Sequence, residues 1–347
     1  MEAFNQGVFY LSIVFVLNHF LLMGRVFVRK SGYQWFSLWL YRFSWLCMTY
    51  ILIQLLGSIE SLTLLWTQMN FAVFLMVWLL MGIDIFLQFK LKLSGASLWI
   101  ASVSGIWMVL QRVLKFKIHE NEHIGSLGFP AVDHLVHDSF HSLGVFFLLL
   151  SVSIFWVSVA VGLNLWILQL KEDSNQSQRK KYYSVFSVCF GGILSFLMIK
   201  FQSDLVWSSF ENYYWIVAYL LGIIGLIVSM LVVFRNIDLW VLQMGPFRRN
   251  QRVFDVLLRM SCFFSTIGLI FTLLWVENSS GSFFNLTRGL LCMVLFWYVG
   301  VLGLHFRNKK INGELGNGQT VVGLFILTSG IGGALLHYLW QPSLFIK

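Results

Sequence analysis

Long apolar runs, separated by short polar segments, recur along the whole chain. A run of about 20 apolar residues crosses a bilayer as an α-helix, because a helix satisfies its own backbone hydrogen bonds in lipid. The pattern therefore predicts an all-α, polytopic transmembrane helical bundle of about ten spans. We place these spans at 7–28, 36–57, 61–88, 96–114, 142–170, 183–203, 212–234, 256–276, 285–306 and 319–340.

The composition favours a membrane protein over a soluble one. Only 11% of the 347 residues are charged and 58% are hydrophobic, whereas a soluble domain carries roughly 25% charged residues. This balance argues against a soluble enzyme, a disordered chain and a nucleic-acid-binding domain. The chain also lacks a phosphate-binding glycine loop, a dinucleotide-binding fingerprint and a zinc-protease motif. We therefore expect no catalytic activity from this chain alone.

The basic residues fall mainly on one side of the predicted membrane. If the N-terminus is outside, 18 of the 24 lysines and arginines lie in inner segments and 6 in outer ones. The positive-inside rule then predicts that both termini are outside (N-out/C-out) and that the number of spans is even. The net charge of +9 is explained as a topological signal, with membrane lipid as its expected contact and no nucleic acid.

Few ionisable residues lie near the centres of the spans, although pumps and proton-coupled transporters usually need them. Asp84 lies near the inner end of the third span, and we interpret it as an interfacial group and not as a proton relay. The four cysteines all fall in predicted spans and form no CxxC pair. Small apolar packing residues are the preferred interpretation for Cys47, Cys189, Cys262 and Cys292.

Histidines are concentrated in the outside segment 115–141, which holds five of the eight in the chain. Pro130 is suited to the first turn of a helix, where its missing N–H is not needed. If a helix follows, His134, His137 and His141 are spaced i, i+3 and i+7 and share one face. Imidazole is a good ligand for heme iron. The alternative is a solvated polar loop that uses histidine as an interfacial aromatic.

The first two histidines of that segment, His119 and His123, are spaced i, i+4. Imidazole also binds zinc and copper. A zinc or copper site that uses this pair together with His134 and His137 is therefore a separate hypothesis.

Aromatic residues crowd a second outside segment, residues 201–219. Trp207, Tyr214 and Trp215 lie at a predicted span boundary, where an aromatic belt is common in any membrane protein. Glu211 among them is less expected for a simple belt. The segment is therefore a second candidate for ligand binding.

Several short stretches between residues 129 and 235 follow the order of a known family. A Pro-Ala stretch precedes a histidine at the start of a span, and a Gly-Ile-Leu-Ser stretch lies in the next helix. A tryptophan and a glutamate then keep their spacing in the outside loop, and a basic residue ends the following helix. These residues are Phe129–Val132, His141, Gly192–Ser195, Trp207, Glu211 and Arg235. On them the chain resembles the CcsA/HemX family of cytochrome c assembly proteins.

The resemblance implies a heme-handling protein of the bacterial inner (plasma) membrane. It implies that His141 is an axial heme ligand at the outer face. The family's second outside histidine has no counterpart in 277–284, and we expect His134 or His137 to take its place. The aromatic residues would line the porphyrin, Glu211 would orient the loop, and a partner assembly subunit would help to pass heme to an apocytochrome c. The porphyrin-lining residues would be Trp207, Tyr214 and Trp215.

The resemblance also divides the chain. Residues 1–114 form an N-terminal four-span region, and 277–347 contribute two additional spans. Between them, residues 115–276 form the CcsA/HemX-like core, with the outside histidine loop at 115–141 and a degenerate tryptophan-rich loop at 201–219. The Asp, Pro and Lys of the family's loop motif are replaced by Ser208, Ser209 and Phe210.

Three alternatives to heme handling remain open at this point. The chain could be a non-catalytic scaffold or anchor subunit of a larger membrane complex that has lost heme, in which case it has no cofactor. It could be a sensory membrane domain that works with a separate output protein. The third is the metal site in the histidine loop.

Overall fold

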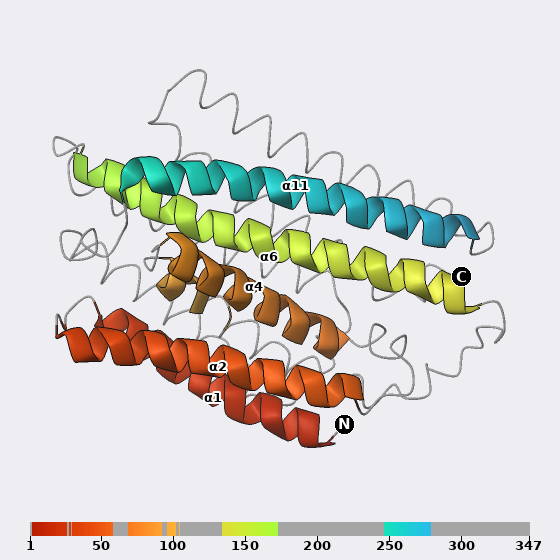
Figure 1. The fold of residues 1–347 in the computed structure, drawn as a ribbon, viewed down its shortest axis with the longest axis horizontal. Coiled ribbons are helices and arrows are strands. Elements are labelled where there is room, and N and C mark those ends of the chain that lie inside the picture. Colours follow the sequence, from red (N-terminus) through yellow and green to blue (C-terminus); the bar gives the residue numbers. More distant parts are fainter. Residues whose placement is uncertain are drawn as a thin grey trace, which may run out of the picture.

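The computed structural model describes residues 2–25, 28, 30–57, 69–91, 96–101, 104, 134–172 and 246–278. These residues contain no strand, and most of them belong to five long helices. The helices are α1 (Glu2–Gly24), α2 (Ser31–Gly57), α4 (Met69–Leu91), α6 (His134–Glu172) and α11 (Phe247–Asn278) (Figure 1). The predicted all-α class is therefore confirmed for the described part of the chain.

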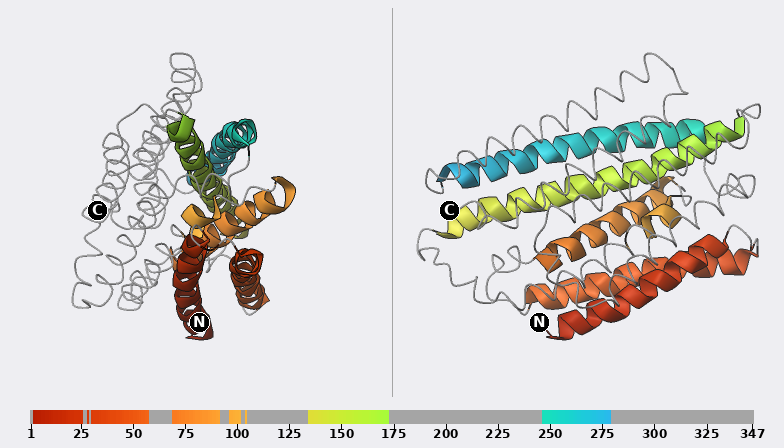
Figure 2. Two further views of the ribbon diagram at one scale, coloured as in Figure 1. Left: turned by 90° about the vertical axis from the view of Figure 1, so that its left-hand side faces the viewer. Right: turned by 180° about the vertical axis from the view of Figure 1, so that it is seen from behind.

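The helices lie side by side in the order α1, α2, α4, α6, α11, and each packs against the next (Figures 1 and 2). The helices α1, α4 and α6 run toward one end of the bundle, and α2 and α11 run away from it. Gly24, Ser31, Leu91, Glu172 and Phe247 lie at one end of the bundle, on the left of Figure 1. All five belong to segments that the charge pattern assigns to the inner side, so this end is called the basic end below.

Three of these helices contain stretches long and apolar enough to cross a membrane: Ser31–Gly57, Ser142–Leu165 and Phe247–Phe271. They correspond to the predicted spans 36–57, 142–170 and 256–276. The predicted spans at 183–203, 212–234, 285–306 and 319–340 lie outside the described residues.

The outer face of α2 shows the pattern of a helix that faces lipid. Its large exposed side chains recur every three or four residues, and they are aromatic or aliphatic. Trp35 stacks on Trp39 with ring centroids 6.3 Å apart, and Trp39 stacks on Phe43 at 5.2 Å. A continuous exposed apolar stripe of this kind is rare on a soluble monomer. The stripe consists of Trp35, Trp39, Phe43, Leu46, Tyr50 and Ile53.

Two helices extend well beyond their predicted spans. The helix α6 begins at His134, eight residues before the predicted start, and α11 begins at Phe247, nine residues before it. Hydropathy marks only the apolar part of a helix, and the first turns of both helices are polar. The last eight residues of the predicted histidine loop are therefore helix and not loop.

The α6–α11 interface includes small residues at its closest contacts. The Ser151 hydroxyl donates to the Ser261 carbonyl at 2.8 Å, and the Ser261 hydroxyl donates to the Ser151 carbonyl at 3.0 Å. A Cβ placed on Gly268 would lie 2.9 Å from the Leu148 backbone nitrogen and 3.1 Å from the Gly144 carbonyl oxygen. Small residues let two membrane helices approach closely and use polar contacts between them.

The α2–α4 interface is held by two tryptophans. The Trp45 and Trp78 rings stack with centroids 5.7 Å apart, and the Trp45 indole donates to the Trp78 carbonyl at 3.0 Å. The Trp78 indole donates to the Thr49 hydroxyl at 2.9 Å. A Cβ on Gly82 would lie 3.2 Å from the Trp45 indole nitrogen, so the glycine makes room for the ring.

Candidate functional site

The three histidines predicted to share a face lie on the first two turns of α6. His134 is the first residue of the helix, and the helix continues unbroken through His137 and His141 to Glu172. Positions three and seven residues apart lie on the same side of a helix. The expectation of a helix across these positions is therefore confirmed for the backbone, although the helix begins four residues after Pro130.

The position of His141 relative to the apolar stretch is also as expected. The stretch able to cross a membrane begins at Ser142, directly after His141. This end of α6 lies opposite the basic end of the bundle, on the same side as the N-terminus (Figure 1). The histidine positions thus mark the junction between a polar first turn and an apolar helix.

The remaining predicted ligand residues lie outside the described residues. These are His119, His123, Trp207, Glu211, Tyr214 and Trp215. Among the side chains that the structure does describe, no three His, Cys, Asp or Glu residues come together to hold a metal ion.

A buried polar cluster that the sequence analysis did not predict lies toward the basic end of the bundle. Its centre is Asp84 on α4, which is 0% exposed. Gln88 follows one turn later on the same face, and its Nε2 donates to Asp84 Oδ2 and to Ser97 Oγ, both at 2.9 Å. The interpretation of Asp84 as an interfacial group is therefore wrong. It points into the protein, where α4 packs against its neighbours.

Arg42 of α2 joins the cluster through Gln88. Its Nε and Nη2 atoms donate to Gln88 Oε1 at 3.3 and 3.2 Å, and its guanidinium lies 4.3 Å from the centre of the Phe89 ring. These contacts fix the Gln88 amide, because the opposite orientation would place its NH₂ group against the guanidinium donors. Gln88 thus connects an arginine on one helix to a carboxylate on another.

Two further residues complete the cluster. Arg25 lies directly after α1 and is 5% exposed. Its positive charge attracts the negative charge of the Asp84 carboxylate. Tyr41 of α2 is fully buried, and its hydroxyl lies beside the Asp84 carboxylate. Within the described residues, neither the Tyr41 hydroxyl nor Asp84 Oδ1 has a well-aligned hydrogen-bond partner. We call Arg25, Tyr41, Arg42, Asp84, Gln88 and Ser97 the Asp84 cluster.

The Asp84 cluster has two properties that matter chemically. It draws on α1, α2, α4 and the segment 96–101, and it carries two arginines against one carboxylate. Ionisable residues inside membrane helices are costly, and they usually mark a functional or binding site. One local signal could have found part of it, namely the Asp84 and Gln88 pair at i, i+4. The contribution of Arg42, 46 residues from Gln88, has no such signal.

The two cysteines that the structure describes are free thiols. Cys262 is buried in α11, and Cys47 is partly buried in α2. Both contribute to the hydrophobic core or pack against it, which agrees with their interpretation as packing residues.

Comparison of the chain with protein-family models, with curated proteins and with solved structures gives no match.

Proposed function

We propose that this chain is a multi-pass protein of the bacterial inner membrane with both termini outside. The support comes from three helices that can cross a membrane and from the position of the basic residues. The helix directions bring exposed Lys30, Lys90, Arg248 and Arg249 toward the same end of the bundle. Such an excess of lysine and arginine is typical of the cytoplasmic side.

Labelling of single cysteines in whole cells tests this orientation. A cysteine at position 278, at the far end of α11, should react with a membrane-impermeant maleimide, whereas one in place of Lys30 should react only after the cells are opened. All four native cysteines, Cys47, Cys189, Cys262 and Cys292, are changed to serine or alanine in the background. Labelling of Lys30→Cys in intact cells would contradict the proposed orientation.

We further propose that the protein binds or positions heme at the outer face. The observation that carries this proposal is the unbroken start of α6. It places His134, His137 and His141 on one face, with the last of them directly before the membrane-spanning stretch. On this proposal His141, together with His134 or His137, would hold the heme iron. When bound, heme would supply an iron atom that imidazole side chains can coordinate.

The surrounding residues would hold and orient the porphyrin. Trp207, Tyr214 and Trp215 would provide apolar contact, and Glu211 would orient their loop, as the family resemblance implies. The role is binding and delivery to an apocytochrome c, for which a partner assembly subunit would provide the thiol chemistry. A helix start at a membrane surface suits this role, because a ligand there can be reached from outside.

An absorbance spectrum of the purified protein, combined with a pyridine hemochrome assay, tests the heme proposal. The wild-type protein should show a Soret band at near-stoichiometric heme, and His141→Ala should lose it. His19→Ala is the matched control, because His19 lies within α1 and has no proposed role in heme binding. An unchanged spectrum of His141→Ala would remove His141 from the proposal.

A scaffold subunit without heme is the second candidate function. It is favoured by Ser208, Ser209 and Phe210, which replace the family's loop residues. This candidate predicts a flat spectrum from heme-replete cells and a partner protein that stays bound in mild detergent. Stoichiometric heme would count against it.

A further inference from the structure

The charges of the Asp84 cluster do not balance. The carboxylate of Asp84 interacts with the charge of Arg25, and the neutral Gln88 side chain stands between Asp84 and Arg42. Among the described residues, Arg42 has hydrogen bonds only to Gln88 and a ring contact only with Phe89. Two arginines against one carboxylate leave the cluster with one excess positive charge, and Arg42 is the more exposed of the two arginines.

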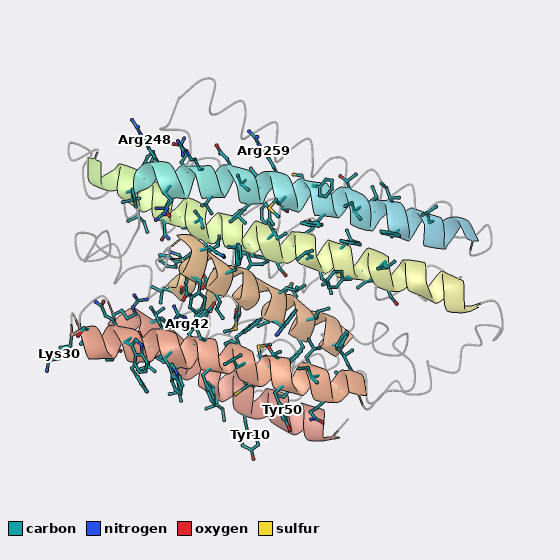
Figure 3. The ribbon with its side chains drawn as sticks, viewed as in Figure 1. Tyr10, Lys30, Arg42, Tyr50, Arg248 and Arg259 are labelled. Carbon is teal, nitrogen blue, oxygen red and sulfur yellow. The ribbon has the colours of Figure 1, made fainter. Side chains whose placement is uncertain are left out.

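The arginine is also placed where a ligand can reach it. Arg42 is only partly buried, and it lies between α2 and α4 in the half of the bundle that leads to Lys30 (Figure 3). A guanidinium has five N–H donors on three nitrogens. Gln88 takes one N–H from Nε and one from Nη2, so both N–H groups of Nη1 and the second of Nη2 remain as donors. Phe89 covers one face of the group and limits the directions of approach.

Exposed apolar side chains lie on the same stretches of α2 and α4 as Arg42 and Phe89. Phe86 and Phe89 of α4 are 58% and 64% exposed, and Trp39 and Phe43 of α2 are 44% and 45% exposed. A ligand that fits these surroundings has an anionic group for Arg42 and an apolar body for the rings. A small hydrophilic anion would bind Arg42 but would make no contact with the apolar rings.

We propose that an anionic phospholipid of the inner leaflet binds here, with its phosphate on Arg42 and its acyl chains along the exposed rings of α2 and α4. Basic pockets between membrane helices on the cytoplasmic side bind such headgroups, and arginine recognises phosphate through paired N–H donors. This inference rests on the membrane placement proposed above, but not on heme binding.

Lipid retention by the full chain in detergent, measured by native mass spectrometry, tests the proposal. The probes are phosphatidylglycerol, phosphatidylcholine and inorganic phosphate. Wild-type protein should retain phosphatidylglycerol over phosphatidylcholine. Arg42→Gln should lower that preference roughly fivefold, the usual effect of one basic residue near an anionic surface. Arg259→Gln is the matched control, because Arg259 is exposed on α11 and points away from α2 and α4 (Figure 3), and it should keep the preference.

A second variant keeps the proposal testable if Arg42→Gln does not fold. Phe89→Leu keeps an exposed apolar side chain but removes the ring under the guanidinium, and it should lower the preference about twofold. Equal losses in Arg42→Gln and Arg259→Gln would overturn the proposal, since they would indicate general attraction to the basic end. Displacement of the lipid by inorganic phosphate alone, or full preference in both Arg42→Gln and Phe89→Leu, would also overturn it. Release of the wild-type chain from membranes by alkaline carbonate would instead refute the membrane placement.

Discussion

The close approach of α6 and α11 at Gly268 makes a sharp prediction about Gly268→Ala. The added Cβ would lie 2.8 Å from Leu148 Cγ, 2.9 Å from the Leu148 backbone nitrogen and 3.1 Å from the Gly144 carbonyl oxygen. Two of these three atoms belong to the backbone of α6, so a change of rotamer cannot relieve the clash. The two helices must move apart.

The expected cost follows from that separation. Overpacking a well-packed interface costs about 1–3 kcal/mol, and the backbone contacts place Gly268→Ala at the upper end of this range. Separation would also weaken the reciprocal Ser151–Ser261 hydrogen bonds, each worth about 0.6 kcal/mol between membrane helices. We therefore expect a loss of about 3 kcal/mol in the free energy of unfolding.

Two other glycines provide matched controls within the same chain. A Cβ on Gly32 would meet nothing within 4 Å, so Gly32→Ala should be neutral or stabilising by up to about 1 kcal/mol because alanine favours the helix. On Gly7 the nearest atom is Ile51 Cδ1 at 3.1 Å, the end of a flexible side chain, and we expect an effect between the other two.

Unfolding in mixed micelles by SDS titration, followed by circular dichroism, measures all three variants. The double variant Gly268→Ala with Leu148→Ala separates side-chain from backbone effects. It removes the contact with Cγ but leaves those with the α6 backbone, so it should not recover the stability lost through Gly268→Ala. Equal stability of Gly268→Ala and Gly32→Ala would refute the close packing of α6 and α11.

Further predictions concern the cluster, the tryptophan pair and the histidine loop. Asp84→Ala should destabilise the protein by about 1.5–3 kcal/mol, because it removes the buried hydrogen bond that the Gln88 amide donates to a charged acceptor. The same SDS titration measures this, and stability equal to that of Gly32→Ala would contradict it. Trp78→Phe keeps an aromatic ring but removes the indole N–H that donates to Thr49 and part of the surface stacked on Trp45. It should therefore cost at least about 0.6 kcal/mol in the same assay. Elemental analysis after gentle purification tests the zinc or copper hypothesis for residues 115–141, which predicts a stoichiometric metal that is lost when His123 is changed to alanine.

The helices were largely predictable from the sequence because their signals are local. Apolar runs located α2, the apolar part of α6 and that of α11, since a hydrophobic stretch of sufficient length reports directly on a membrane helix. The polar first turns of α6 and α11 were missed as parts of spans, because hydropathy does not distinguish a polar helical turn from a loop. Only Pro130 and the spacing of the three histidines indicated a helix before His141.

The candidate site was also predictable only where its signal is local in the sequence. The shared face of His134, His137 and His141 depends only on helix periodicity, and α6 confirms it at the level of the backbone. The Asp84 cluster depends on which helices are neighbours, and no periodicity provides that information. A charged residue near the end of a predicted span looks the same in sequence whether it faces water or the protein interior.

Three buried serines that bond within their own helices show by contrast what the burial of Asp84 requires. Ser44, Ser153 and Ser158 each donate to a carbonyl three or four residues earlier in their own helix, at 2.8, 2.8 and 2.7 Å. Each is therefore satisfied locally and can be buried at little cost in any arrangement of helices. Within its own helix, the described hydrogen bond of the Asp84 side chain is the one it accepts from Gln88. Its burial requires Arg25, α2 and Ser97 to be in place, so the cluster stabilises one arrangement of α1, α2 and α4 over others. The same arrangement leaves Arg42, the more exposed arginine of the cluster, between α2 and α4, which makes the proposed lipid site a consequence of how the carboxylate is buried.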